Sequence, residues 1–191
     1  MHVETAELAD VLVFRPTPHR DDRGFFTRTF DADVAAAHGL EPAAFVQDSQ
    51  SRSAVGTLRG LHGRGGAGEG KLVRCARGAI LDVIVDARSG SPTFGRHQAF
   101  RLDDEQLCCL YVPPGFLHGF QVLSDVADIC YRIDRPHDPS EDLSVRYDDP
   151  DLAVPWPLPV DTLSPRDRTA GSWRELVASG ATEGISTDGR R

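Results

Sequence analysis

The sequence predicts an all-β domain built as a sandwich or barrel, and three observations lead to this class. Short runs of strand-forming residues recur along most of the chain and are separated by turn signals. Glycine and proline, with 18 and 13 residues, are both frequent, which suits tight turns between short strands. The alternation of strands and helices that is typical of parallel α/β folds is missing from the pattern. A length of 191 residues fits one domain with a sizeable core.

The expected elements follow from these runs. Strands are predicted at 11–14, 25–30, 45–50, 57–62, 71–76, 79–86, 97–102, 107–112, 118–123 and 128–133. Short helices are predicted at 32–38, where Gly39 ends the pattern, and at 172–179. Between them, residues 150–165 carry five prolines and indicate an extended C-terminal arm. We expect residues 1–179 to form a single domain and the polar residues 180–191 to form a disordered tail.

Composition and charge exclude several classes of function. The formal net charge of −8 disfavours a nucleic-acid binder, although a few arginines converging in one cleft could still hold an anionic small molecule. No long apolar run predicts a membrane span, and Glu4, Glu7 and Asp10 interrupt the start where a secretion signal would lie, so we expect a cytoplasmic protein. The four cysteines form no CxxC pair, which favours buried reduced thiols over a zinc site.

Three segments could carry chemistry in the first half of the strand region. On a regular strand Leu58, Gly60 and His62 share one face, and His62 would lie where a barrel opens, just before a glycine-rich stretch. A lone histidine is more often structural than catalytic. Lys71 starts an apolar strand, where it is either solvated or aimed inward to stabilise an oxyanion. Asp82 lies inside an apolar strand and needs a partner, for which Lys71 or an arginine is the natural choice.

Two later residues complete the set. His118 begins a strand after a Pro-Pro-Gly turn, and Tyr131 shares a face with apolar neighbours, where a tyrosine is more often core than catalyst. Metal binding is disfavoured because the position two residues after His62 is Arg64, so the closely spaced histidine pair of a metal site is missing.

Taken together, seven stretches resemble the dTDP-4-dehydrorhamnose 3,5-epimerase family, the RmlC-like cupins. They are 22–26 (DRGFF), 45–48 (FVQD), 58–62 (LRGLH), 71–75 (KLVRC), 91–95 (SPTFG), 113–120 (PPGFLHGF) and 163–167 (LSPRD), in the family's order and with nearly its spacing. The resemblance implies a cupin-type jelly-roll β-barrel with short peripheral helices. It also implies an isomerase that inverts C3, C5 or both in a nucleotide-linked 4-keto-6-deoxyhexose, without a cofactor or a metal.

The resemblance also implies roles for individual residues. His62 would be the base, with Asp167 orienting it, and Tyr131 would be the acid on the opposite side. Lys71 and Arg59 would stabilise the enolate oxygen, with Asp82 positioning Lys71.

Further residues would bind the nucleotide-sugar substrate. They are Arg23, Phe26, Gln47, His118 and His137. Arg23 would reach the site of a partner subunit, which implies a homodimer.

The chain departs from the family pattern around the pocket. His62 is followed by Gly63 and Arg64 where an aromatic residue and glutamine are common, and Glu69 stands where glutamine is common. The aromatic pair that covers the base is replaced by Pro136 and His137, and imidazole offers less stacking area than phenol. These changes favour an altered substrate, handled by a 3-only or 5-only epimerase of natural-product biosynthesis. A sugar-nucleotide 3,4-ketoisomerase and a non-catalytic sugar-nucleotide-binding cupin remain the alternatives.

Overall fold

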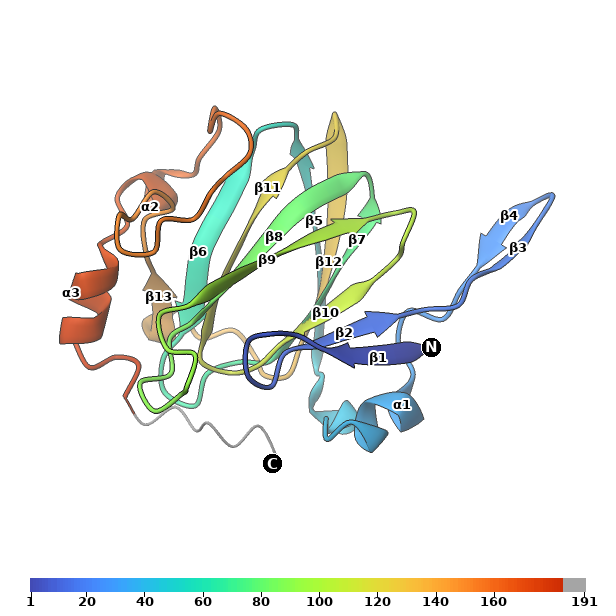
Figure 1. Cartoon of the computed structure of the whole chain (residues 1–191), viewed down its shortest axis with the longest axis horizontal. Coiled ribbons are helices and arrows are strands. Elements are labelled where there is room, and N and C mark those ends of the chain that lie inside the picture. The colour runs from blue at the N-terminus through green and yellow to red at the C-terminus, as the bar shows by residue number, and fades with distance from the viewer. Residues whose placement is uncertain (184–191) are drawn as a thin grey trace.

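The computed structural model describes residues 1–183, and the strands of its body form two antiparallel sheets that face each other (Figure 1). The six-stranded sheet has the order β1 (His2–Thr5), β2 (Leu12–Arg15), β10 (Cys109–Val112), β7 (Lys71–Arg77), β12 (Val126–Ile133), β5 (Gln47–Ala54). The five-stranded sheet has the order β13 (Asp142–Ser144), β6 (Leu58–Arg64), β11 (Phe116–Val122), β8 (Ala79–Asp86), β9 (His97–Asp103). The predicted all-β class is confirmed.

The main core lies between the two sheets. Val73 of β7 and Ile129 of β12 pack with Ile80, Ile84 and Phe120 from the facing sheet, and all five are almost completely buried. Strand β8 shows why the sequence folds this way, because its run of branched aliphatic residues suits a strand buried on both faces.

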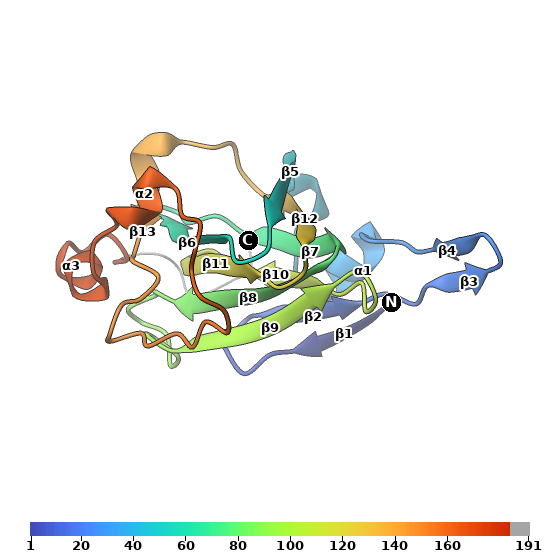
Figure 2. The ribbon, with the colours of Figure 1, turned by 90° about the horizontal axis from the view of Figure 1, so that it is seen from above.

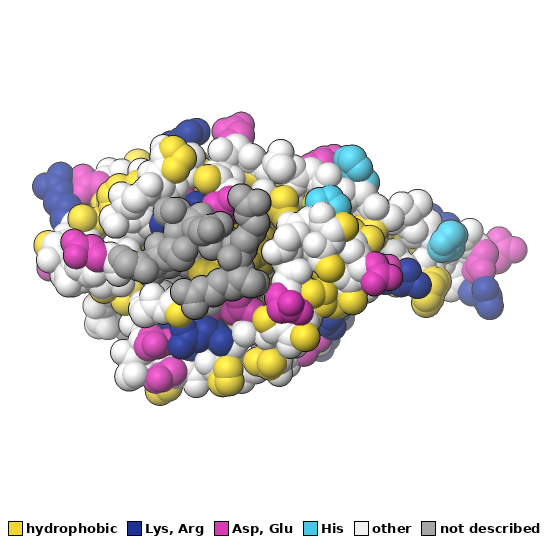
Figure 3. All heavy atoms as spheres, turned by 90° about the horizontal axis from the view of Figure 1, so that it is seen from below, with side chains coloured by type: hydrophobic (Ala, Val, Ile, Leu, Met, Phe, Trp, Pro, Cys, Tyr) yellow, Lys and Arg dark blue, Asp and Glu magenta, His cyan; other side chains and the backbone are white. Residues whose placement is uncertain are grey.

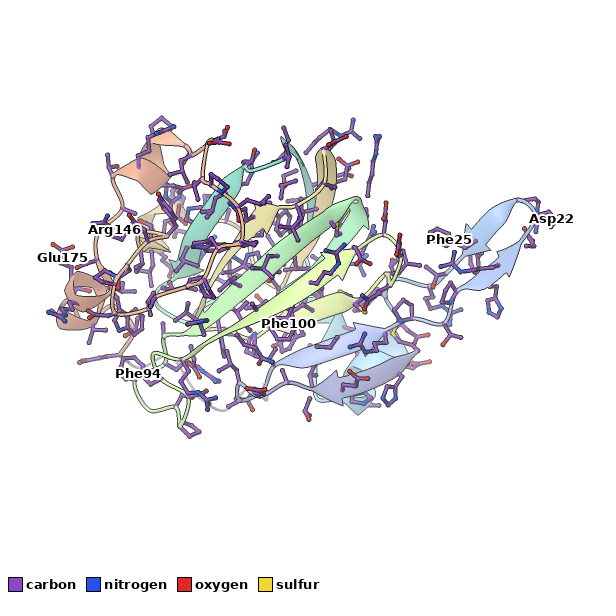
Figure 4. All side chains as sticks on the ribbon, turned by 45° about the horizontal axis from the view of Figure 1, so that its top comes forward. Asp22, Phe25, Phe94, Phe100, Arg146 and Glu175 are labelled. Atoms are coloured by element: carbon purple, nitrogen blue, oxygen red, sulfur yellow. The ribbon has the colours of Figure 1, made fainter. Side chains whose placement is uncertain are left out.

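A third, two-stranded sheet projects from the body as a hairpin, β3 (His19–Asp21) with β4 (Gly24–Phe26) (Figures 1 and 2). Figure 4 shows Asp22 at its outer end, and Figure 3 shows acidic, basic and histidine side chains along it. The strand predicted over 25–30 is therefore too long, since Phe30 leaves the hairpin and packs against Phe45. All residues of both strands are exposed, including Phe26 at 73%.

The segment after β13 wraps the outer side of the five-stranded sheet. It carries α2 (Pro165–Arg168) and α3 (Trp173–Ala178), the latter started by a capping box of Ser172 and Glu175. Trp173 and Leu176 pack with Leu61, Val85 and Leu117 in a second core cluster. The remaining short helices are α1 (Ala32–Ala37), η1 (Pro42–Ala44) and η2 (Pro139–Glu141).

The end of the chain was predicted to be a tail over 180–191. Residues 180–183 form a turn in which Thr182 is buried, and residues 184–191 lie outside the described residues. Among residues 1–183, no helix is long and apolar enough to cross a membrane.

Candidate active site

A bulge in β6 brings Arg59 and His62 to the same side of the strand. His62 pairs with His118 of β11, and Arg59 pairs with Phe120, so β6 carries one residue more than its partner over this stretch. The extra residue reverses the alternation of faces. The expectation that Leu58, Gly60 and His62 share one face is therefore wrong, because it assumed a regular strand.

Two glycines allow β6 and β11 to approach closely at the bulge. A Cβ on Gly60 would lie 2.5 Å from the Cα of Gly119, and a Cβ on Gly119 would lie 2.9 Å from the carbonyl oxygen of Arg59. Gly60 also has a φ of +140°, which L side chains rarely adopt.

The cavity beside this bulge has a volume of about 230 Å³ and takes side chains from both sheets. The five-stranded sheet contributes Arg59, His62, His118 and Phe120, the six-stranded sheet contributes Lys71 and Tyr131, and the segment at α2 contributes Ser164, Arg166 and Asp167. His62 and Tyr131 thus lie on opposite walls of one cavity. A reacting carbon between them would have one side chain on each face.

His62 and Asp167 form a hydrogen-bonded pair, with Nε2 of the imidazole 2.5 Å from Oδ1 of the carboxylate. Asp167 is 2% exposed and sits in the first turn of α2, where its N–H donates to Oγ of Ser164, the N-cap residue. Burial acts to raise the pKa of Asp167, but hydrogen bonds from His62 and Ser164 and the charge of His62 bring it below its usual value. A carboxylate that stays ionised can orient the imidazole and stabilise its protonated form.

Tyr131 provides a neutral hydroxyl on the other wall. Its oxygen lies 3.1 Å from Oγ of Ser51, and its ring meets the ring of His118 edge-on with centroids 6.3 Å apart. Burial raises the pKa of Tyr131, and the negative charge of Asp82 raises it further. The phenol therefore stays protonated at neutral pH, which suits a proton donor.

The structure gives Lys71 and Asp82 different partners from those predicted. Lys71 Nζ lies 2.8 Å from Oε1 of Glu69, whereas Oδ2 of the fully buried Asp82 lies 2.7 Å from Nε2 of His118. The pairing of Asp82 with Lys71 is thus corrected. The reason is register: Asp82 faces Phe120 on the adjacent strand β11, so His118 is its diagonal cross-strand neighbour, while Lys71 lies on the opposite sheet.

Four predicted substrate-binding residues lie away from this cavity within the chain. Arg23 and Phe26 are on the projecting hairpin, where Arg23 pairs with Asp21. Gln47 starts β5, and His137 is an exposed loop residue 3.2 Å from a carboxylate oxygen of Asp142. The cavity therefore unites six of the predicted residues: Arg59, His62, Lys71, His118, Tyr131 and Asp167.

Sequence reasoning missed several neighbours of these side chains. No sequence pattern assigned a role at the site to four of them, which are Ser51, Phe120, Ser164 and Arg166. Glu69 was noted only as a departure from the family pattern, although its position two residues before Lys71 placed it close by.

The arrangement can remove a proton next to a carbonyl group. It combines an imidazole backed by a carboxylate, a neutral phenol on the opposite wall and the cations of Lys71 and Arg59. Within residues 1–183, no group of three His, Cys, Asp or Glu side chains has the arrangement of a metal site.

Comparison with known proteins extends this result. A family model described as dTDP-4-dehydrorhamnose 3,5-epimerase matches residues 5–175. The dTDP-4-dehydrorhamnose 3,5-epimerase of Escherichia coli is 41% identical over 180 residues, which cover 93% of this chain and 97% of the relative.

Solved structures of related epimerases share the fold, and two of them illustrate it. NovW, a 4-keto-6-deoxy sugar epimerase from the novobiocin biosynthetic gene cluster of Streptomyces spheroides, has a TM-score of 0.90 at 37% identity, covering 95% of this chain and 92% of that one. ChmJ, a 3'-monoepimerase from Streptomyces bikiniensis in complex with dTDP-quinovose, has a TM-score of 0.86 at 32% identity. The match covers 92% of this chain and 90% of the ChmJ chain.

The fold and these likenesses define the class of the protein as a cupin-like isomerase of the epimerase type, as the sequence predicted. More narrowly, the chain belongs to the dTDP-4-dehydrorhamnose 3,5-epimerase family.

Proposed function

We propose that this chain epimerises a dTDP-linked 4-keto-6-deoxyhexose at C3, C5 or both, by proton abstraction and return without a cofactor. The observation that carries the proposal is the placement of the His62–Asp167 pair and the neutral Tyr131 on opposite walls of one cavity. The names of the relatives support the substrate class, since they act on or bind dTDP sugars.

The reaction begins with His62, which takes the proton from the carbon next to the keto group. The electron pair of that C–H bond forms a double bond to C4, and the π pair of the carbonyl moves to the C4 oxygen, which gives an enolate that Lys71 and Arg59 stabilise. Asp167 stabilises the imidazolium that results. Tyr131 then gives its proton to the opposite face of the same carbon, and the enolate returns to the ketone with inverted configuration. Solvent restores the proton of Tyr131 and accepts that of His62.

A homodimer would complete the site. The hairpin leaves the body with all of its residues exposed, and it carries the predicted substrate-binding residues Arg23 and Phe26 (Figures 1 and 4). In the proposed dimer these residues reach the nucleotide at the partner's cavity, while Gln47, His118 and His137 contact the substrate from the same subunit. An Arg23→Ala variant is expected to raise KM more than it lowers kcat.

Two further features belong to the proposal. The changed pocket residues favour inversion at a single carbon, as in the 3'-monoepimerase relative. The cytoplasmic location expected from the sequence remains a prediction.

Product analysis tests the function. The purified chain is incubated with dTDP-4-keto-6-deoxyglucose, and the sugar is followed by ¹H and ¹³C NMR. An epimerase leaves the carbonyl at C4 and inverts C3, C5 or both. A carbonyl at C3 would instead identify a 3,4-ketoisomerase, and binding without any change in the sugar would identify a non-catalytic sugar-nucleotide-binding protein.

A further inference from the structure

Lys71 belongs to a buried group of three charges that the proposed mechanism does not explain. Oε1 of Glu69 lies 2.8 Å from Lys71 Nζ, and Oε2 of Glu69 lies 2.9 Å from Nη2 of Arg64. The exposed fractions of the three side chains are 13% for Lys71, 8% for Glu69 and 3% for Arg64. The carboxylate of Glu69 therefore bridges the cations of Lys71 and Arg64, and all three groups are largely shielded from solvent.

Arg64 lies beside this carboxylate as an ion pair, although Oε2 of Glu69 accepts no hydrogen bond among the described residues. Its Nη1 donates a hydrogen bond to the carbonyl oxygen of Pro136, whereas its Nε has no hydrogen-bond partner among the described residues. A buried guanidinium needs a counter-charge, and the ion pair with Glu69 supplies it.

The loop that carries Glu69 is fixed by other contacts. Oδ1 of Asp134 accepts a hydrogen bond from the N–H of Gly70, and Nη1 of Arg135 donates to the carbonyl oxygen of Gly68. Arg135 also pairs with Glu141. The backbone on both sides of Glu69 is therefore held by contacts that do not involve Lys71.

Charge decides how this group acts on Lys71. A carboxylate 2.8 Å from an ammonium group, with no other partner, would cancel much of its field in a partly dry cavity. Here Arg64 shares the same carboxylate, so the three groups together keep one positive charge. Lys71 lines the cavity, and Arg64 does not.

We propose that Glu69 and Arg64 are positioning residues for Lys71: Glu69 fixes the ammonium at the cavity wall, and Arg64 takes up carboxylate charge so that Lys71 remains a cation toward the substrate. The inference rests on the proposed function, in which Lys71 stabilises the enolate oxygen. Replacing both Arg64 and Glu69 by neutral side chains would leave the group with the same net charge of one, carried by Lys71.

Four full-length variants test the inference by steady-state epimerisation of dTDP-4-keto-6-deoxyglucose. Arg64→Gln leaves Glu69 to neutralise Lys71 and should lower kcat about tenfold with KM little changed, a size typical of coupling between contacting charges. Arg64→Lys keeps the charge and should stay within about threefold of wild type. The double variant Arg64→Gln/Glu69→Gln restores the net charge and should recover most of the loss. Arg174→Gln is the control. It removes the same charge from an arginine that forms an exposed ion pair with Asp151, and it should not alter kcat.

The outcomes separate this inference from the proposed function. Lys71→Met should lower kcat about 100-fold, as the loss of one oxyanion donor does. If Lys71→Met is impaired but Arg64→Gln matches wild type, or if the double variant is no better than Arg64→Gln, the inference is wrong and the proposed function stands. An inactive wild-type chain would overturn both. Thermal unfolding of each variant shows whether a loss of kcat is accompanied by a loss of stability, and a loss of kcat in Arg64→Gln at an unchanged melting temperature is attributed to the charge.

Discussion

Oδ1 of Asp167 lies 2.5 Å from Nε2 of His62, although 105 residues separate the two along the chain. The carboxylate comes from the first turn of α2 and the imidazole from the bulged strand β6. The position of the proposed base thus depends on how the C-terminal arm returns to the five-stranded sheet.

Replacing this carboxylate should impair catalysis without removing the base. Asp167→Asn keeps the shape of the side chain but cannot stabilise an imidazolium, so we expect kcat to fall about 100-fold, within the range of general acid–base effects. Steady-state epimerisation assays measure this. Asp161→Asn, an exposed residue of the same arm, is the control and should change kcat less than about twofold. Equal losses in the two variants would contradict the assigned role.

The same residue should affect acid stability. Because the native pKa of Asp167 lies below its usual value of 3.8, its ionised form stabilises the fold above that pH. This contribution is lost as the pH falls below 3.8 through the native pKa. The difference in the free energy of unfolding between wild type and Asp167→Asn should therefore narrow as the pH falls below 4. Urea unfolding at several pH values tests this, and a constant difference would reject it.

Removing the hydroxyl of Tyr131 should separate the two proton transfers. In Tyr131→Phe, His62 can still abstract the proton and return one to the same face, so deuterium from solvent should enter the sugar without inversion. NMR in deuterated water distinguishes exchange from epimerisation. Tyr147→Phe, outside the cavity, should behave as wild type. Inversion at the wild-type rate in Tyr131→Phe would show that another group is the acid.

The bulge should not tolerate a side chain at Gly60. An alanine Cβ there would lie 2.5 Å from the Cα of Gly119, so we expect a loss of about 2 kcal/mol or more in unfolding free energy. Gly24→Ala is a matched control, because Gly24 also has a positive φ but no atom lies within 4 Å of an added Cβ. Denaturant unfolding compares the two, and equal losses would mean that the backbone angle, and not the close approach, sets the requirement.

Much of the fold followed from local patterns, and the failures have physical causes. Strand 79–86 was predicted with the bounds that β8 has, since its aliphatic run has strong strand propensity. Strands β1 and β13 were not predicted because each is short and no apolar run marks it.

At the site, too, features that depend on how strands pair could not be predicted from local sequence patterns. Six of the residues lining the cavity were predicted from the sequence and its family resemblance, but the partner of Asp82 was not, because the partner of a strand residue depends on the register. Only the pairing of β8 with β11 brings His118 to Asp82, and only the bulge turns Arg59 and His62 to one side. Neither feature has a signal in a single strand's sequence.

Solvent exchange tests the central claim most directly. Wild type and His62→Ala are each incubated with dTDP-4-keto-6-deoxyglucose in deuterated water, and the C3 and C5 protons of the sugar are followed by NMR. The account predicts that wild type replaces the proton at C3, C5 or both with deuterium and that His62→Ala does so at least about 100-fold more slowly. Exchange at an undiminished rate in His62→Ala would contradict the assignment of His62 as the base, and no exchange in wild type would contradict the proposed reaction itself.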